Sequence, residues 1–545
     1  MNKPYEMESI EAKEPSTETK GQPTSTETGI IAIQSIAERD DAMLRRVGKK
    51  PVLKRSFGFM SMLGFSCTVM ITWEGNLMAF STIFTNGGSA GSLYAYLITW
   101  VGTLMVFATM GELASMAPTS GGQYHWVSML APAKSRKFLS YMIGWLTVIG
   151  WQSGVAGIGF LSGTLIQGII ALNNANYMPK PWQGTLLFWA AIFFAVFINT
   201  VVSSLLPKVE GSVLILHVLG FFAILIPLVN MGPQGNASDV FTVFQNGGGW
   251  QTQGVSFMIG MIGSVWNFLG ADSAVHMSEE IRNAAVIVPR TMIFSIMLNG
   301  ILGFAMLVAI LFRLGDVEIV FATPSGFPFM AVFQQAVGAN GGADTMIAIV
   351  IVLAISATIS ITASASRMTW SFARDRGLPG WKYLSKVDSR TSIPVIAVGL
   401  TATISCLLAL INIGSTTVFS DLISLTINGL FTSYFIGNSL FLWRRLTGKI
   451  RNGNESDGGL RNVESDHLVW GPTRIPEPLG TIVNFLGCVW MIVVLFFSYW
   501  PTANDPTPQT MNYSSLMVGA TVIFSTVYYL VWAKKEYTGP VIEIS

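Results

Sequence analysis

Long apolar runs alternate with short polar segments along this chain. Twelve runs are long enough to cross about 30 Å of hydrocarbon, so the pattern predicts an all-α integral membrane protein with twelve transmembrane helices. The predicted spans are residues 57–84, 92–116, 139–171, 184–206, 212–231, 254–278, 291–314, 345–372, 393–412, 416–443, 479–500 and 515–533. Residues 1–50 are polar and predict a disordered N-terminal tail, and residues 536–545 a short C-terminal tail.

Two of the predicted spans carry an acid and a glycine near their middle. The first contains Thr72-Trp73-Glu74-Gly75-Asn76, and the sixth contains Asn267-Phe268-Leu269-Gly270-Ala271 followed by Asp272. An acid at the centre of a bilayer costs about 2.5–3.5 kcal/mol on insertion scales, so both acids are candidate functional residues. We expect both helices to be broken here, because a break supplies free carbonyls and a half-helix N-terminus to a solute.

The spacing of the two breaks predicts the topology. They lie five spans apart, in corresponding positions of two halves, and an odd number of spans per half turns the second half upside down. The predicted membrane domain of twelve spans covers residues 51–535. It divides into a first repeat at 57–231, an inverted second repeat at 254–443 and two additional helices within 479–533.

Composition supports a membrane protein and excludes other classes. The chain is 51% hydrophobic and 11% charged, whereas an average soluble domain is about 25% charged. A net charge of +2 gives no electrostatic support for a nucleic-acid partner. Cys67, Cys406 and Cys488 match no disulfide or metal spacing. We expect no metal, no cofactor and no enzymatic activity, because no nucleophile–base pair is placed in the spans.

The distribution of Lys and Arg predicts the orientation. One set of alternating loops is rich in these residues, whereas the other set holds only Lys180 and Arg313. The imbalance predicts that both termini are cytosolic. The sequons at Asn236 and Asn512 then lie outside as predicted glycosylation sites, and the sequon at Asn454 lies inside and is not used.

Three motifs carry a resemblance to a known family. The first runs from Glu112 through Ser120, Gly121, Gly122 and Tyr124 to Trp126, the second is GADSAVHMSEEIRNAAVIVPR (270–290), and the third is SRMTWSFARDRGLPGW (366–381). In this order and spacing they resemble the amino acid–polyamine–organocation superfamily of permeases, above all its fungal amino acid, GABA and choline branch. The resemblance implies a LeuT-type fold of five plus five inverted spans with two further helices, and secondary transport.

Glu74 is the first candidate to bind the cationic group of a solute, with Trp73 or Phe268 adding a cation–π face. The alternative is that neighbouring hydroxyls such as Thr72 hold Glu74 in a structural role. Asp272 has two interpretations as well, in gating or coupling and as a cap of the half-helix after the break. The predicted substrate site comprises Thr72, Trp73, Glu74, Gly75, Trp266, Asn267, Phe268, Gly270 and Asp272.

Proton coupling is assigned to Asp272 and to His217, which lies inside the fifth span and titrates near neutral pH. The alternative for His217 is a neutral, hydrogen-bonded ring. The alternating Ser and Thr residues of the eighth span also leave two interpretations, close helix packing and a hydroxyl-lined ion or proton site. An inner gate is predicted from charged residues near the cytosolic ends of the spans: Lys54, Arg55, Glu279, Glu280 and Arg367.

These features together predict a secondary active transporter in the plasma membrane. It would import a small nitrogenous solute such as choline, GABA or another amino acid by alternating access, with a proton as the co-transported ion. The alternative is a transporter-like nutrient sensor that binds the solute and signals through its tails with little flux. Uptake of labelled solute separates the two hypotheses.

Overall fold

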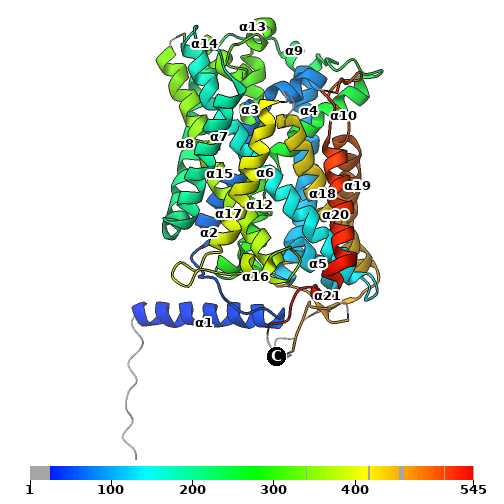
Figure 1. Cartoon of the computed structure of the whole chain (residues 1–545). Helices are drawn as coiled ribbons and strands as arrows, with labels where there is room; N and C mark the ends of the chain where they lie inside the picture. Colours follow the sequence, from blue (N-terminus) through cyan, green and yellow to red (C-terminus); the bar gives the residue numbers. More distant parts are fainter. Residues whose placement is uncertain are drawn as a thin grey trace, which may run out of the picture.

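The computed structural model describes residues 25–543 apart from 339, 415–417, 453–458, 465 and 509. The predicted disorder of residues 1–24 and the sequon at Asn454 lie outside the described residues. The described chain is a bundle of long, roughly parallel and antiparallel helices (Figure 1).

Nine helices of the described residues are long and apolar enough to cross a membrane. Three of them include a neighbouring short helix: α8 follows η1 (Ser203–Leu205), α17 continues into η3 (Leu410–Ile413), and α20 continues through the π-helix η4 (Tyr529–Ala533) into α21 (Lys534–Glu536). The nine are α4 (Phe80–Met116), α6 (Arg136–Asn173), α7 (Pro181–Thr200), α8 (Leu206–Met231), α12 (Ala284–Phe312), α15 (Asn340–Arg374), α17 (Val395–Ala409), α19 (Leu479–Ser498) and α20 (Ser514–Tyr528).

The first and sixth predicted spans are each divided between short helices. The first consists of α2 (Phe59–Met70) and α3 (Thr72–Met78), and the chain then continues into the start of α4, which departs from helical geometry at Gly88. The sixth consists of α10 (Gln253–Asn267), α11 (Ser273–His276) and the 3-10 turn η2 (Ser278–Glu280). Both predicted interruptions are therefore observed. The tenth predicted span is α18 (Val418–Leu446), which carries charged residues in its first and last turns.

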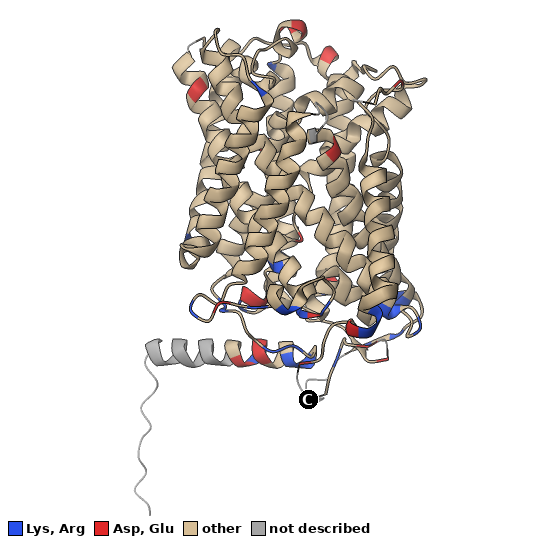
Figure 2. Ribbon diagram, in the orientation of Figure 1, with Lys and Arg blue, Asp and Glu red and all other residues tan. Residues whose placement is uncertain are grey.

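Lys and Arg gather at one end of the bundle, and the middle holds few charged residues (Figure 2). We call this end the charged face and the opposite end the far face. The charged face carries α1 (Ser25–Arg46), α5 (Gln123–Leu130) and α16 (Trp381–Leu384), with the small parallel pair β1 (Ile450–Arg451) and β2 (Leu468–Val469) in the chain between α18 and α19. The far face carries α9 (Ala237–Thr242), α13 (Val317–Phe321) and α14 (Pro328–Val337).

The outer helices expose large apolar side chains. Phe193 on α7, Leu219 on α8, Phe496 on α19 and Ile523 on α20 are each more than half exposed. A soluble protein rarely exposes so much apolar surface on long helices. Exposing these apolar side chains costs free energy in water but not in lipid. The outer surface is therefore that of a multi-pass membrane protein.

The two tails correct one prediction. Residues 25–50 are not disordered, because α1 occupies Ser25–Arg46 and the side chains of Leu44, Val47 and Lys49 are buried. The C-terminal residues also fold back onto the bundle, where Tyr537 is fully buried against the rings of Tyr141 and Phe372. The prediction of disorder rests on the average composition of the whole tail, whereas its last residues are apolar and basic and pack against the bundle.

The environment of Asn512 argues against the predicted glycosylation of this residue. A glycan is attached to the side-chain nitrogen, but here that nitrogen donates hydrogen bonds to the carbonyls of Ser498 and Trp500, each at 3.0 Å, and the residue is buried. Glycosylation at Asn512 is therefore excluded in this fold. Asn236 is exposed at the start of α9 on the far face, and glycosylation there stays a prediction.

Candidate functional site

The break in the first span is sharp. α2 ends at Met70, and Ile71 adopts the left-handed conformation with φ 36° and ψ 49°. A β-branched residue in this region is a genuine outlier that the surrounding structure must hold in place. The side chain of Ile71 is fully buried, so packing fixes the strained turn, and α3 begins at the next residue.

The break in the sixth span is built differently. α10 ends at Asn267, and Gly270 has φ 105°, a conformation that L side chains rarely adopt. A Cβ atom at Gly270 would lie 2.6 Å from the Cγ1 atom of Val69, in the last turn of α2. Glycine is therefore required here twice, by the backbone conformation and by the close approach of the first break.

The two breaks are joined directly to each other. The hydroxyl of Thr72 donates a hydrogen bond to the carbonyl of Asn267 at 2.9 Å, which satisfies a carbonyl freed by the end of α10. The Asn267 amide donates to the side-chain oxygen of Asn76 at 2.8 Å. A Cβ atom at Gly75 would meet the Asn267 side chain at 2.5 Å. The structure thus brings Thr72, Gly75 and Asn267 of the predicted site together.

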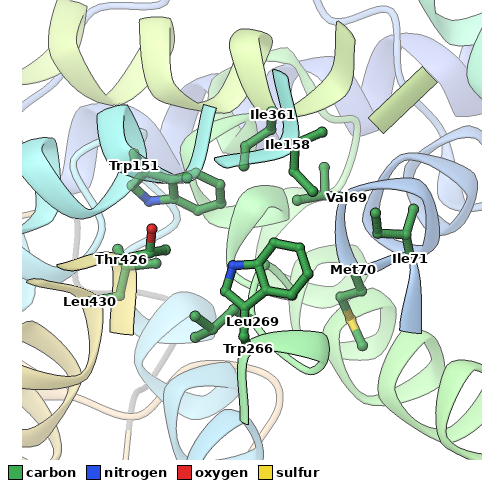
Figure 3. Close-up of a pocket in the computed structure, with 12 residues that line it drawn as sticks. Val69, Met70, Ile71, Trp151, Ile158, Trp266, Leu269, Ile361, Thr426 and Leu430 are labelled. Carbon is green, nitrogen blue, oxygen red and sulfur yellow. The ribbon is translucent and has the colours of Figure 1, made fainter. Parts of the chain in front are cut away.

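A small cavity lies against both breaks (Figure 3). Its volume available to water is about 30 Å³. This is enough for one or two water molecules and too small for a whole solute. Two indole rings, Trp151 from α6 and Trp266 from α10, lie among its walls, and Thr426 brings a hydroxyl. The remaining lining is apolar or glycine: Val69, Met70, Ile71, Gly154, Ile158, Leu269, Gly270, Ile361 and Leu430.

A second cavity lies one helical turn further along two of the same helices. Ile262 of α10 lines it, four residues before Trp266, and Ile423 of α18 lines it, three residues before Thr426. Since α10 starts near the far face and ends at the break, this second cavity lies on the far-face side of the first. The two cavities are consistent with a route from the far face toward the breaks.

Glu74 and His217 form a buried pair beside the first break. The Oε1 atom of Glu74 lies 2.7 Å from the Nδ1 atom of His217 on α8, and both side chains are fully buried. The other oxygen of Glu74 and the Nε2 atom of His217 have no hydrogen-bond partner among the described residues. Two titratable groups at this distance share one proton readily, and each keeps an atom free to take up or release another.

Asp272 has a different environment at the second break. Its Oδ2 atom accepts a hydrogen bond from the Gln123 amide at 2.8 Å, and the Tyr434 hydroxyl faces the carboxyl group. His276 lies one turn later, with its Nε2 atom 3.8 Å from Asp272.

Hydrogen bonds fix His276 as a neutral ring. Its Nε2 atom accepts from the indole N–H of Trp151 at 2.8 Å, so its Nδ1 atom donates to the carbonyl of Ser120 at 3.0 Å. A ring that already uses one nitrogen as acceptor and the other as donor has no position for a further proton. His276 therefore orients Trp151 at the cavity and does not serve Asp272 as a base.

Of the nine predicted substrate residues, only Trp266 and Gly270 line the cavity in this conformation. The other seven do not: Thr72, Trp73, Glu74, Gly75, Asn267, Phe268 and Asp272. Trp73 packs against His217 and Phe221, and Phe268 packs against Tyr96, so neither ring offers a cation–π face to the cavity. Glu74 is engaged with His217 instead. The aromatic faces come from Trp151 and Trp266, because the helical turn after Ile71 directs residues 73 and 74 toward α8.

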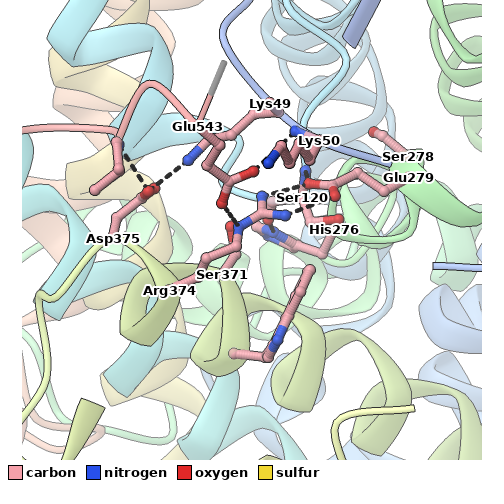
Figure 4. Close-up of polar contacts among 12 residues, drawn as sticks. Lys49, Lys50, Ser120, His276, Ser278, Glu279, Ser371, Arg374, Asp375 and Glu543 are labelled. Carbon is pink, nitrogen blue, oxygen red and sulfur yellow. Dashed lines mark hydrogen bonds and ion pairs between the residues drawn. The ribbon is translucent and has the colours of Figure 1, made fainter. Parts of the chain in front are cut away.

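A buried network of charges closes the charged face (Figure 4). Lys49 forms an ion pair with Asp375 just beyond α15, and the Tyr124 hydroxyl donates to the same carboxylate at 2.7 Å. Arg374 forms a two-pronged pair with Glu279, with N···O distances of 2.7 and 2.9 Å. Arg367 donates to Glu280 at 2.8 Å. Buried paired charges of this kind are costly to separate one partner at a time.

The five residues predicted to form an inner gate do not all lie in this network. Glu279, Glu280 and Arg367 lie in the network, but Arg55 pairs with Asp41 of α1 at 2.6 Å. Lys54 is exposed and makes no ion pair with the described residues. The cation that reaches the network from the N-terminal side is Lys49. Further along, Ser56 and Phe57 donate backbone hydrogen bonds to the carbonyl of Glu280, and Arg55 turns to Asp41 instead.

The C-terminal residues complete the network. The backbone N–H of Val541 donates to Asp375 at 2.8 Å, and Glu543 lies 3.6 Å from the guanidinium of Arg374. Glu543 also accepts from the backbone N–H of Lys50 at 2.8 Å. The segment that follows α1 and the C-terminal residues therefore meet at the end of α15.

Two carboxylates of the network, those of Asp375 and Glu279, are held in their charged forms. Burial opposes the charge of Asp375, yet Lys49 and Arg374 outweigh it and keep the pKa of this carboxyl below its usual range. Burial likewise opposes the charge of Glu279, and the Arg374 pair holds the pKa of Glu279 below its usual range. The ion pairs consequently persist through the neutral range.

Several residues of the site and of the charged network were not identified from the sequence. Their partners lie far away in the chain: this holds for Lys49, Gln123, Asp375, Tyr434 and Glu543. The third motif does contain Arg374-Asp375, a charged pair directly at the end of an apolar run, and this was the available signal. Among the described residues, no cluster of three or more His, Cys, Asp or Glu side chains is arranged to hold a metal ion.

Comparisons with known proteins agree with this architecture. A family model described as amino acid permease matches residues 57–523. The chain is 27% identical over 487 residues to the choline transporter of Saccharomyces cerevisiae, covering 89% of this chain and 83% of that protein. It is 26% identical over 525 residues to the amino-acid permease BAT1 of Arabidopsis thaliana, covering 93% and 98%.

A third relative is the swainsonine transporter swnT of Arthroderma benhamiae, 27% identical over 512 residues and covering 92% of this chain and 97% of that protein. These relatives are permeases and transporters, not enzymes. The family model covers most of the chain, from the start of the first broken helix into α20. The chain therefore belongs to the amino acid permease family and is a multi-pass membrane transporter.

Proposed function

We propose that this permease is a proton symporter that imports a small nitrogenous solute by alternating access. The observation that carries the proposal is the Glu74–His217 pair, in which an acid and a base share a fully buried site next to a broken helix. Protonation of this pair changes the charge three residues after Ile71, which lines the cavity. Proton binding and the shape of the solute site are thus coupled through one short turn.

The proposed architecture is twelve spans in a LeuT-type five plus five inverted repeat. Nine apolar helices support this proposal, and with the two broken helices and α18 as further spans the proposed number of crossings is twelve. The position of the breaks supports the repeat, since one lies in the first span and the other in the sixth. The direct bond between Thr72 and Asn267 joins the two halves at their breaks.

For the solute, we favour choline or a related amine over neutral amino acids. Trp151 and Trp266 place two indole rings beside the cavity, and such rings attract quaternary ammonium groups by about 0.5–2 kcal/mol. No carboxylate lines the cavity in the described part of the chain, and a fixed positive head group needs no hydrogen-bond acceptor. The relative in Saccharomyces cerevisiae that is named a choline transporter supports this choice.

The transport cycle follows from which side is closed. The cavity adjoins a second cavity toward the far face, while the ion pairs around Asp375 and Glu279 close the charged face. We propose that solute and proton enter from the far face, that the breaks move apart to enlarge the contracted cavity, and that the ion pairs then separate. Because Lys and Arg gather at the charged face, we propose that this face is cytosolic. We also propose that the protein resides in the plasma membrane.

Uptake into proteoliposomes tests the proposal. The purified protein is reconstituted, and accumulation of labelled choline is measured under an inward proton gradient, under an inward sodium gradient and with neither, with GABA and neutral amino acids as competitors. We expect accumulation with the proton gradient alone, and competition by amines. Accumulation driven by sodium, or binding of choline with no accumulation under any gradient, would contradict a proton symporter; the second result would favour a sensor.

A further inference from the structure

A third buried acid lies on α8, outside the site described so far. Glu210 is 1% exposed, and its Oε1 atom accepts a hydrogen bond from the hydroxyl of Ser360 on α15 at 2.7 Å. The hydroxyl of Thr68 on α2 also faces this carboxyl. Glu210 therefore lies where the first half of the broken helix meets α8 and α15.

No cation neutralises Glu210 within the described part of the chain. Its Oε2 atom has no hydrogen-bond partner there, and it takes part in none of the ion pairs. The nearest basic residue in sequence, Lys208, is exposed, and Arg367 of α15 is already paired with Glu280. A buried carboxyl with hydroxyl partners and no countercharge is costly to ionise, so it holds a proton and releases it only to a suitable acceptor.

The other long helices packed against α8 bring no charge to Glu210. α2 carries no Asp, Glu, Lys, Arg or His, and neither does α14. The one charged residue of α12, Arg290, is exposed. The titratable group that shares the face of α8 with Glu210 is His217, seven residues later. Seven residues make almost two full turns, so the two side chains lie on one face about 10 Å apart along the helix.

A column of hydroxyl groups continues from Glu210 along α15. Ser356, Ser360 and Ser364 are buried at four-residue spacing, which places them on one face of the helix. The hydroxyl of Ser364 has no partner among the described residues. Arg367, three residues after Ser364 and so nearly one turn further, belongs to the charged network. Hydroxyl groups both donate and accept, so such a column is able to pass a proton.

We infer that Glu210 is a second proton site, between the Glu74–His217 pair and the charged face, and that it carries the co-transported proton toward release. The inference rests on the proposed proton symport. In the step, an N–H bond of the His217 imidazolium breaks and an O–H bond forms on the Glu210 carboxylate, through the intervening hydroxyls. The imidazole returns to its neutral form, and the carboxyl later loses the proton at the charged face. No oxidant or further reactant is needed.

Infrared difference spectroscopy of the purified full-length protein tests the site without any solute. Between about pH 5 and about pH 8, we expect a change in the carbonyl band of a protonated carboxylic acid. This band should be absent in Glu210→Gln and present, at shifted frequency, in Glu210→Asp. A control variant, Ser405→Ala, removes a buried hydroxyl on α17 that lies off the route and should leave the band unchanged. A band that is the same in wild type and Glu210→Gln would overturn the inference.

Transport separates a proton site from a structural role. In proteoliposomes, we expect Glu210→Gln to lower choline accumulation under a proton gradient by at least about tenfold, while exchange of internal for external choline falls by less than about threefold. Equal loss of both activities would overturn the inference, as would undiminished accumulation. If wild type shows no proton-driven uptake, the proposed function fails, and the infrared band still decides whether Glu210 exchanges a proton.

Discussion

The two breaks of this permease use the same device with different chemistry. Each interrupts a span next to a buried acid. At the first, the acid Glu74 is paired with a base, His217. At the second, the acid Asp272 is held by an amide and faces a phenol, and the nearby His276 is locked as a neutral ring. The comparison assigns proton exchange to the first break and positioning of the cavity wall to the second.

The two breaks also differ in backbone strain. The first break forces Ile71 into a left-handed conformation and holds it by packing, whereas the second uses Gly270, which tolerates its conformation. A strained turn is able to store about 1–3 kcal/mol that a movement releases. The first break is therefore the element better suited to switch when a proton binds.

The largest expected effect comes from Gly270→Ala. The new Cβ atom would lie 2.6 Å from Val69 in a backbone conformation with φ 105°, so we expect the protein to lose about 2–4 kcal/mol of stability and most choline binding. Thermal unfolding in detergent and a binding assay measure the two losses. Gly437→Ala on α18, where a Cβ atom would meet nothing within 4 Å, is the matched control and should leave both nearly unchanged.

The pH dependence of uptake by His217→Gln tests whether proton exchange occurs at the first break. The ion pairs at the charged face rest on carboxyl groups whose pKa values are lowered, so their contribution is present above about pH 4 and lost only as the pH falls below it. Variation of uptake between about pH 5 and 8 must then arise elsewhere. We expect His217→Gln to flatten this profile and to lower uptake about tenfold at its optimum. A profile that keeps its shape would contradict the assignment to the first break.

A smaller effect is expected from Thr72→Val, which removes the hydrogen bond between the breaks. The carbonyl of Asn267 would stay buried without its hydroxyl donor, at a cost of about 1–3 kcal/mol. Thr72→Ser keeps the hydroxyl and should lose less than half as much in thermal unfolding. A larger loss for Thr72→Ser than for Thr72→Val would mean that the methyl group, and not the hydrogen bond, holds the breaks together.

The smallest effect is expected from Glu543→Gln at the charged face. Its carboxylate lies 3.6 Å from Arg374 and is partly exposed, so the pair is worth about 0–1 kcal/mol. We expect a modest rise in the reactivity of a cysteine introduced at Ser278 toward a water-soluble maleimide. Asp375→Asn, which leaves the buried Lys49 unpaired, should raise it far more; reversed order would contradict the described gate.

The sequence was informative about single positions and poor about pairs. Polar and small residues inside apolar runs located both breaks, because lipid tolerates such residues only where they serve a purpose. The partners of Glu74 and Asp375 lie 143 and 326 residues away, and no local pattern encodes such contacts. Side-chain direction was the other failure, since a shift of one residue along a helix turns a side chain by about 100°. Trp73 and Phe268 pointed away from the cavity for this reason.

The most direct test compares Glu74→Gln with Asp272→Asn in proteoliposomes that accumulate labelled choline. The account predicts that Glu74→Gln abolishes the response to an inward proton gradient, with a loss of about 100-fold in gradient-driven uptake, and that Asp272→Asn transports less but still responds to the gradient. If Asp272→Asn loses the response and Glu74→Gln retains it, proton coupling does not lie at the first break and the central claim is wrong.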